Sequence, residues 1–456
     1  MTEVAPAQPA THPTLFGHPR GLTFLVLTEM WERFSYYGMR ALLVLYMVKY
    51  LFLPEHAQNV IGYAQLKAGF EFLFGPLGVQ PLASQVYGFY TGLVYLTPVF
   101  GGMLADRVFG QRRMVIAGAL LMALGHFMMA FESLMLFALL VLILGNGAFK
   151  PNISTQVGSL YPPGDPRRDR AFSIFYVGVN LGAFFAPLVC GTLGSVYGWH
   201  YGFGAAGIGM LVGLGIYLYA APMLPEEARA KRANASSPLT GSERRSVVAL
   251  AILFLPVTLF WATYEQQGNT IALWASDHTD RMIDLGFWRG EIPAEWFQSF
   301  NPFMIFAFTP FIVALWAWQA ARGREPSSIT KMAFGCFGVA AANLILVAAA
   351  LSSSGRNASW LWLVPYFAVI TIGELYLSPT SLSLVSKIAP ARLLSMLMGV
   401  WLATSFIGNF VSGWLGSFWT AMDKPVFFLM IAGVAGAAGA VILALSRPLR
   451  DATVER

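Results

Sequence analysis

The chain has 456 residues, of which 56% are hydrophobic and only 11% are charged. Average soluble domains carry about 25% charged residues, so this composition excludes an ordinary soluble protein. The apolar residues come in runs of about 20, which is the length that crosses a bilayer as a helix. The sequence therefore predicts a helical membrane protein with many spans.

The formal net charge of +6 would suit a nucleic-acid partner, but the placement of the basic residues argues against one. Most of the 29 lysines and arginines fall into every second loop between the apolar runs. The positive-inside rule places these loops, and both termini with them, in the cytoplasm. Cys190 and Cys336 both lie within apolar runs, so they indicate neither a disulfide framework nor a metal site.

The apolar runs predict twelve spans in two sets of six. They are expected at residues 21–51, 84–105, 113–131, 134–157, 170–193, 201–222, 246–274, 300–319, 330–352, 359–385, 393–418 and 426–446. Two sets of six are typical of major facilitator transporters, which bind substrate near the midplane between the halves. The predicted segments are a cytoplasmic tail (1–20), an N-terminal six-helix bundle (21–222), a cytoplasmic linker (223–245), a C-terminal six-helix bundle (246–447) and a second cytoplasmic tail (448–456).

Two polar segments differ from the short loops elsewhere. The first 20 residues are rich in proline and show no signal-peptide pattern. Residues 52–83 form a long loop after the first span, and the sequence FEFLFG within it could be a short interfacial helix. We favour a loop with a single amphipathic turn.

The first span carries four ionisable side chains within the sequence EMWERFSYYGMR. A charge at the centre of a bilayer costs about 3 kcal/mol or more, so such residues usually face a bundle interior or an aqueous cavity. Helical spacing places Glu29, Arg33, Tyr36 and Arg40 on one stripe, with Glu32 one position away. Either these charges neutralise one another, or they line a cavity together.

Three further charges lie inside later spans. Lys150 occurs in LGNGAFKPNIS, Glu265 in FWATYEQQGN and Glu374 in TIGELYLSPTS. The first half thus supplies cations and a Glu/Arg cluster, and the second half supplies lone carboxylates. A cavity between such walls suits a zwitterion with separated charges, such as a short peptide. Buried carboxylates beside cations are also natural proton carriers.

Several polar or aromatic side chains within the spans are further candidates. Each type is more often used for helix packing or interhelical hydrogen bonds than for ligand binding, so each is ambiguous by itself. These residues are Tyr95, Asn180, Trp261, Asn301, Ser378 and Trp401.

Seven motifs in order resemble those of the bacterial proton-coupled oligopeptide transporters, a branch of the major facilitator superfamily. They are E-x-x-E-R-F-x-Y-Y-G at 29–38, GGMLADRVFGQRR at 101–113, FYVGVNLGAF at 175–184, and then FKPN, W-x-x-x-E-Q-x-G, QSFNP and GELYLSP. The resemblance covers about residues 21–446. The third motif usually ends Gly-Ser-Leu, whereas here it ends Gly182-Ala183-Phe184. The linker is also too short for the two extra helices that many bacterial relatives carry.

The resemblance implies an all-α membrane protein with twelve transmembrane helices in two six-helix bundles. The implied activity is proton-coupled symport of di- and tripeptides into the cell by alternating access. We expect a transporter rather than an enzyme, without cofactor or metal, acting as a monomer in the lipid of the inner membrane. The expected partners are peptide and protons, with no nucleic acid.

The resemblance also assigns roles to individual residues. Proton coupling falls to Glu29, Glu32, Arg33 and Glu265. The carboxylate end of the peptide would be received by Arg40, Lys150 and Asn180, and its amino end by Glu374, with Asn301 nearby. Glu265 would pair with Arg40 and gate the periplasmic side. The remaining peptide-binding candidates are Tyr36, Tyr37, Tyr95, Trp261, Ser378 and Trp401.

Two other functions compete with peptide transport. The nearest is proton-coupled transport of another small solute such as nitrate, against which Glu374 argues because a carboxylate favours an amino-bearing substrate. The other is an intramembrane enzyme in which paired glutamates activate water. That chemistry needs a supporting His or Asn within reach, and the first span contains neither.

Overall fold

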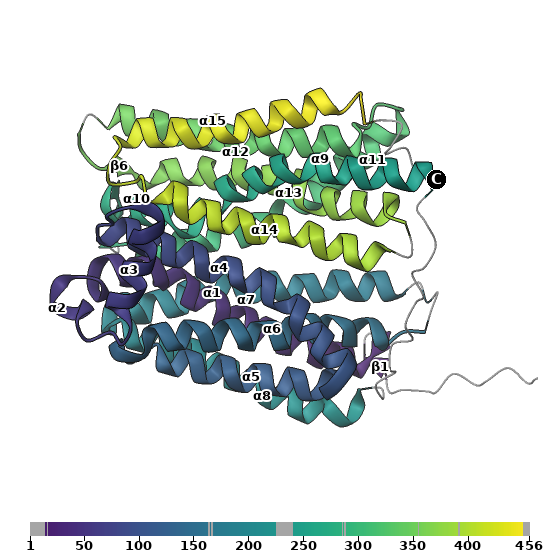
Figure 1. The fold of residues 1–456 in the computed structure, drawn as a ribbon, viewed down its shortest axis with the longest axis horizontal. Coiled ribbons are helices and arrows are strands. Elements are labelled where there is room, and N and C mark those ends of the chain that lie inside the picture. The colour runs from purple at the N-terminus through teal and green to yellow at the C-terminus, as the bar shows by residue number, and fades with distance from the viewer. Residues whose placement is uncertain are drawn as a thin grey trace, which may run out of the picture.

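The computed structural model describes residues 14–15, 17–162, 165, 167–224, 240–284, 286, 289–353, 355–390 and 393–449. Most of these residues are helical, and the long helices run alongside one another as a bundle (Figure 1). The predicted tails, 1–20 and 448–456, and the predicted linker, 223–245, lie largely outside the described residues.

The long helices form two groups, one from each half of the chain (Figure 1). The first group is α1 (Arg20–Tyr46), α4 (Val79–Leu104), α5 (Gln111–Met128), α6 (Met135–Ser159), α7 (Arg167–Tyr197) and α8 (Trp199–Ala220). The second is α9 (Gly241–Tyr264), α11 (Phe300–Ala321), α12 (Ser328–Ser352), α13 (Leu363–Ile388), α14 (Leu394–Gly416) and α15 (Lys424–Leu445).

Short elements extend or connect these helices. The short helices of one or two turns are η1 (Met47–Leu51), η2 (Ala105–Phe109), η3 (Glu132–Leu134), η4 (Ala221–Met223), η5 (Glu265–Gly268), η6 (Ala294–Ser299) and η7 (Trp360–Trp362). The helix α10 (Thr270–Asp277) follows η5. Three pairs of short strands lie in loops: β1 (Thr14–Leu15) with β2 (His18–Pro19), β3 (Thr279–Asp280) with β6 (Ala358–Ser359), and β4 (Met282–Asp284) with β5 (Arg289–Glu291).

Within the described residues, ten helices are long and apolar enough to cross a membrane. The helices α1 and α5 are not among them. The former contains the four ionisable side chains of the first span, and the latter begins with the polar sequence QRR. Both helices nevertheless pack within the first group, α1 against α7 and α8, and α5 against α6. The count of twelve spans therefore stays a prediction.

The long loop after the first span contains more regular structure than the single turn that we favoured. The structure has α2 (Pro54–Ala57) and the twelve-residue α3 (Tyr63–Phe74) there. Glycines with positive φ, Gly62 at 85° and Gly75 at 78°, flank α3 and set its ends. Phe70 packs edge-on against Phe89 of α4, so α3 is anchored on the bundle. The preference for one amphipathic turn was wrong because this tertiary contact stabilises a full helix.

The two groups of helices are joined at the end of the bundle that carries α3, here named the α3 end. Figure 1 shows α2, α3, α10 and β6 at this end and β1 at the opposite one, the β1 end. Hydrogen bonds that cross between the groups include Ser84–Asn269 (2.8 Å), Gln80 to the Gly416 carbonyl (2.9 Å), Trp296–Thr192 (2.9 Å) and Ser299 to the Phe184 carbonyl (2.7 Å).

Candidate functional site

A cavity of about 570 Å³ lies between the two groups of helices. Eleven of the fifteen candidate site residues line it. From the first half these are Tyr37, Arg40, Tyr95, Lys150 and Asn180, and from the second half Trp261, Glu265, Asn301, Glu374, Ser378 and Trp401. Helical periodicity places each of these side chains on the face of its helix that points toward the opposing half.

The wall from the first half presents the ammonium of Lys150. Its Nζ lies 4.9 Å from the centre of the Tyr95 ring, which is a cation–π contact. Within the described part of the chain, no carboxylate lies at ion-pair distance from this nitrogen. Asn180 donates its Nδ2 to the Tyr176 carbonyl at 2.9 Å one turn earlier in α7. Lys150 therefore offers a positive charge to whatever enters the cavity.

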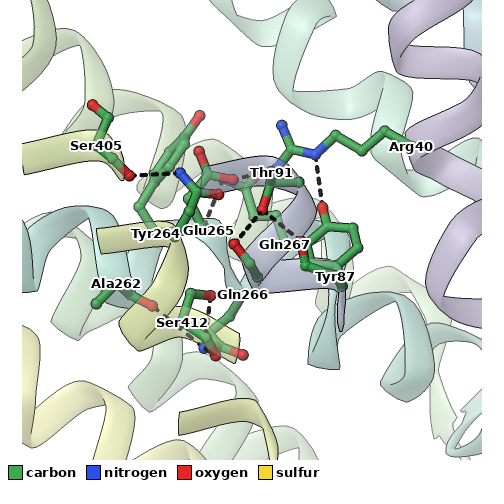
Figure 2. Close-up of polar contacts among 12 residues, drawn as sticks. Arg40, Tyr87, Thr91, Ala262, Tyr264, Glu265, Gln266, Gln267, Ser405 and Ser412 are labelled. Carbon is green, nitrogen blue, oxygen red and sulfur yellow. Dashed lines mark hydrogen bonds and ion pairs between the residues drawn. The ribbon is translucent and has the colours of Figure 1, made fainter. Parts of the chain in front are cut away.

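Arg40 spans the space between the walls. Its Nη2 donates to the Glu265 carboxylate, and its Nε donates to the hydroxyl of Tyr87 at 2.7 Å, as Figure 2 shows. The side chains of Arg40 and Glu265 are only 10% and 2% exposed. Tyr87 was missed in the sequence, where nothing distinguishes it from an aromatic packing residue.

Glu265 lies where the seventh span changes direction. The helix α9 ends at Tyr264, η5 forms one tight turn, and α10 begins at Thr270. Between them, Asn269 adopts φ −115° and ψ −98°, which interrupts the helix. The Gln266 side chain donates its Nε2 to the Ala262 carbonyl at the end of α9 at 3.3 Å and to the Ser412 carbonyl of α14 at 2.9 Å (Figure 2). The break projects Glu265 toward Arg40.

The opposite wall presents the carboxylate of Glu374, in the middle of α13. Its Oε2 accepts hydrogen bonds from the Tyr264 hydroxyl at 2.6 Å and from the Asn301 amide at 2.9 Å. Asn301 also donates to the Thr371 hydroxyl at 3.0 Å, which orients its amide. Glu374 thus carries a negative charge on the wall that faces Lys150.

The Glu/Arg cluster of α1 is buried beside the cavity but does not line it. Arg33 pairs with Glu29 at 3.2 Å and with Glu32 through two contacts, of which the Nη2–Oε1 contact is 2.6 Å. Asn146 of α6 donates to Glu32 at 3.2 Å, and this partner was missed in the sequence. Glu29 Oε2 is buried without a hydrogen-bond partner in the described residues. In this state Arg33 therefore pairs with both glutamates of the cluster, whereas Arg40, the fourth charge of the first span, lines the cavity.

Among the candidates for peptide contact, Tyr36 is the one that does not line the cavity. It is 3% exposed, packs edge-on against Tyr37, and lies under the guanidinium of Arg33 at 5.2 Å. Conversely, several polar residues of the cavity wall were not selected from the sequence, because no pattern distinguishes them there. These are Ser154, Tyr176, Tyr264, Gln267, Gln298, Ser381, Thr404 and Ser405.

The carboxylates of the site are paired with protein donors. Within the residues described, no group of three or more His, Cys, Asp or Glu side chains is arranged to hold a metal ion. The carboxylates of the site face arginine, lysine, tyrosine and asparagine donors instead.

Two helical groups around a central charged cavity define a transporter of the major facilitator type. Residues 112–238 and 228–430 match the model of the POT family. A peptide transporter of Yersinia enterocolitica is 34% identical, over 96% of both chains. A di-/tripeptide transporter of Lactococcus lactis subsp. cremoris is 34% identical, over 96% of this chain and 97% of the relative. The chain belongs to the POT family.

Solved structures agree with this assignment. A crystal structure of a POT peptide transporter in complex with sulfate matches with a TM-score of 0.84 and 31% identity, and 97% of each chain is covered. A POT family transporter in complex with 5-aminolevulinic acid matches with a TM-score of 0.83 and 28% identity, over 96% of this chain and 98% of that one. The predicted major facilitator architecture is confirmed, except for the exact number of spans.

Proposed function

We propose that this protein carries di- and tripeptides into the cell together with protons. The observation that carries the proposal is the pair of oppositely charged walls, with Lys150 on one side of the cavity and Glu374 on the other. A peptide zwitterion has its charges at its two ends, so both walls would be neutralised at once. The names of the similar proteins, peptide and di-/tripeptide transporters, support the same substrate class.

The peptide would lie across the cavity in one orientation. Its carboxylate would meet Lys150 and Asn180, and Arg40 once that side chain leaves Glu265. Its ammonium would meet Glu374. Side-chain pockets would be formed by the aromatic and polar wall residues Tyr37, Tyr95, Trp261, Ser378 and Trp401.

Proton coupling would use the buried carboxylates of α1 and η5. The unpartnered Oε2 of Glu29 is an acceptor that a proton could satisfy, and Arg33 would redistribute between Glu29 and Glu32. Protonation of Glu265 would release Arg40 and weaken the contact between the halves. A membrane potential of 100 mV supplies about 2.3 kcal/mol for each charge that crosses, which supports uphill uptake.

The setting of this activity would be the cytoplasmic membrane of a bacterium. The protein would span it twelve times as a monomer, with bundles at 21–222 and 246–447 and with both termini and the linker in the cytoplasm. The α3 end would then face the periplasm. Because the contacts between the halves lie at this end, the cavity in this state would be accessible from the cytoplasm.

The first test is uptake by the purified protein in liposomes. With an inward proton gradient and an inside-negative potential, labelled dialanine should accumulate. An uncoupler should abolish accumulation, and unlabelled dipeptides should compete with it. Competition by nitrate instead of dipeptides, or no uptake by folded protein, would contradict peptide transport.

Substitution of Glu32 tests the proton pathway. Glu32→Gln removes the charge that Arg33 and Asn146 hold, so gradient-driven accumulation should fall to the level of protein-free liposomes, while exchange of labelled for unlabelled dialanine persists. The matched control is Glu55→Gln, which removes an exposed carboxylate from α2 and should leave both activities unchanged. Undiminished accumulation in Glu32→Gln would refute this role.

A further inference from the structure

The Glu374 carboxylate is bonded asymmetrically. The Tyr264 hydroxyl and the Asn301 amide both donate to Oε2, at 2.6 and 2.9 Å. Within the described residues, no hydrogen bond reaches Oε1. Glu374 lines the cavity, so the oxygen without a protein donor is the one left for a ligand.

The ring of Tyr264 is held rigidly. It stacks on Phe260 with 5.6 Å between ring centres and 13° between planes, and it packs edge-on against Trp261 at 5.6 Å and 89°. Tyr264 is 8% exposed and Phe260 is fully buried. A donor whose rotamer is fixed by packing loses little entropy when it orients a carboxylate, which is the general advantage of preorganisation.

We infer that Tyr264 positions Glu374 for recognition of the amino terminus of the substrate. By occupying Oε2 together with Asn301, it turns Oε1 toward the cavity, where an ammonium group can donate to it. A phenol hydroxyl is a neutral donor, so it orients the carboxylate without cancelling the charge that attracts the ammonium. This inference rests on the proposed peptide transport and extends it to the basis of selection for a free amine.

Other groups that act on Glu374 do not replace this donor. Arg40 is engaged with Glu265 and Tyr87. Glu265, the other nearby carboxylate, repels Glu374 and donates nothing to it. Without the Tyr264 hydroxyl, Asn301 would be the remaining side-chain donor in the described residues, and it already shares its amide with Thr371. The carboxylate would then have several orientations in place of one.

The test is Tyr264→Phe, which removes the hydroxyl and keeps the ring that packs on Phe260. Because the Glu374 carboxylate is no longer held in one orientation, the KM for dialanine should rise about tenfold, which is the effect of weakening one hydrogen bond to a charged group. The maximal rate should stay within about twofold of the wild-type rate. N-acetyl-dialanine, which has no ammonium, should inhibit only weakly, and to the same extent in the wild type and in Tyr264→Phe. A role in packing alone would alter both ligands equally or neither.

Tyr376→Phe is the matched control. It deletes a hydroxyl from α13, the helix that carries Glu374, at a position that packs on Trp316 and does not line the cavity, so both ligands should behave as in the wild type. Direct binding of the two ligands to detergent-purified protein gives the same comparison independently of reconstitution. A wild type that binds no dialanine would refute the proposed function. A wild type that binds it, with Tyr264→Phe equal to Tyr376→Phe, would refute only the present inference.

Discussion

Among the described residues, two ion pairs join the halves at the α3 end, and they differ in burial. Arg40 and Glu265 are almost completely buried, whereas the side chains of Lys49 and Asp277 are each 37% exposed. An exposed pair contributes about 0.2–1 kcal/mol because water screens it. Removal of one partner from a buried pair costs about 3–5 kcal/mol because the other charge stays in a medium of low polarity. Residue by residue, the first pair should dominate closure of this end.

We therefore expect Glu265→Gln to open the α3 end and Asp277→Asn to have little effect. In Glu265→Gln, Arg40 is buried without a counter-ion only in the closed state, so the population of that state should fall about a hundredfold. In Asp277→Asn, the lost pair is exposed, so the closed population should fall less than about fivefold. Spin labels at Gln58→Cys, directly after α2, and Asn357→Cys, directly before β6, would report the distance between the halves by pulsed electron paramagnetic resonance. Equal distance distributions in the two variants would show that burial does not decide the effect.

At the scale of helices, α4 and α14 close the α3 end through contact between backbones. A Cβ at Gly413 would lie 2.7 Å from the Ser84 carbonyl oxygen and 3.0 Å from the Gly88 Cα. The close approach allows the hydrogen bond from Gln80 to the Gly416 carbonyl to form. Small residues at such crossings let helices in a membrane approach one another, which is a general source of their packing energy.

Gly413→Ala should consequently disfavour this closed state. Overpacking costs about 1–3 kcal/mol, and the cost falls only on the state in which α4 and α14 touch. The spin-label distance should lengthen, and dialanine uptake should slow because transport needs both states. Gly433→Ala in α15 is the control, since a Cβ there meets nothing within 4 Å. Unaltered uptake in Gly413→Ala would mean that the helices separate little during transport.

At the scale of the whole molecule, the two ends differ in chemistry as well as in contact. The α3 end carries α2, α3, α10 and the strand pair β3–β6. The loops assigned to the β1 end carry most of the lysines and arginines. A transporter with this asymmetry inserts with its basic loops toward the cytoplasm. In the proposed orientation, the closed end is the periplasmic one.

This orientation predicts which introduced cysteines react in intact cells. A membrane-impermeant maleimide should label Gln58→Cys, at the α3 end, without permeabilisation. Arg324→Cys, between α11 and α12, should react only after the membrane is opened. The native Cys190 and Cys336 are buried and give a low background. Labelling of Arg324→Cys in intact cells would show the opposite orientation. It would also contradict cytoplasmic access to the cavity in this state.

The sequence by itself determined the class of helical membrane protein and indicated which ionisable side chains lie within its helices. Apolar runs and loop charges are local signals, because each helix must satisfy its own backbone in lipid and because charged loops resist translocation. Burial of a charge in lipid is costly, so ionisable residues within a span, such as Lys150 and Glu374, are expected to face a cavity. This expectation does not depend on which residues lie next to them in the fold.

Only the tertiary structure decided how these charges are paired. Helical spacing places Glu29 and Glu32 near Arg33, but it cannot reveal that Asn146 from α6 joins them. It also cannot show that Tyr264 reaches Glu374, 110 residues away, or that Phe89 stabilises α3. Such contacts depend on the register and crossing of helices that are distant in sequence. That geometry is set by packing of the whole bundle and leaves no periodic pattern in any one segment.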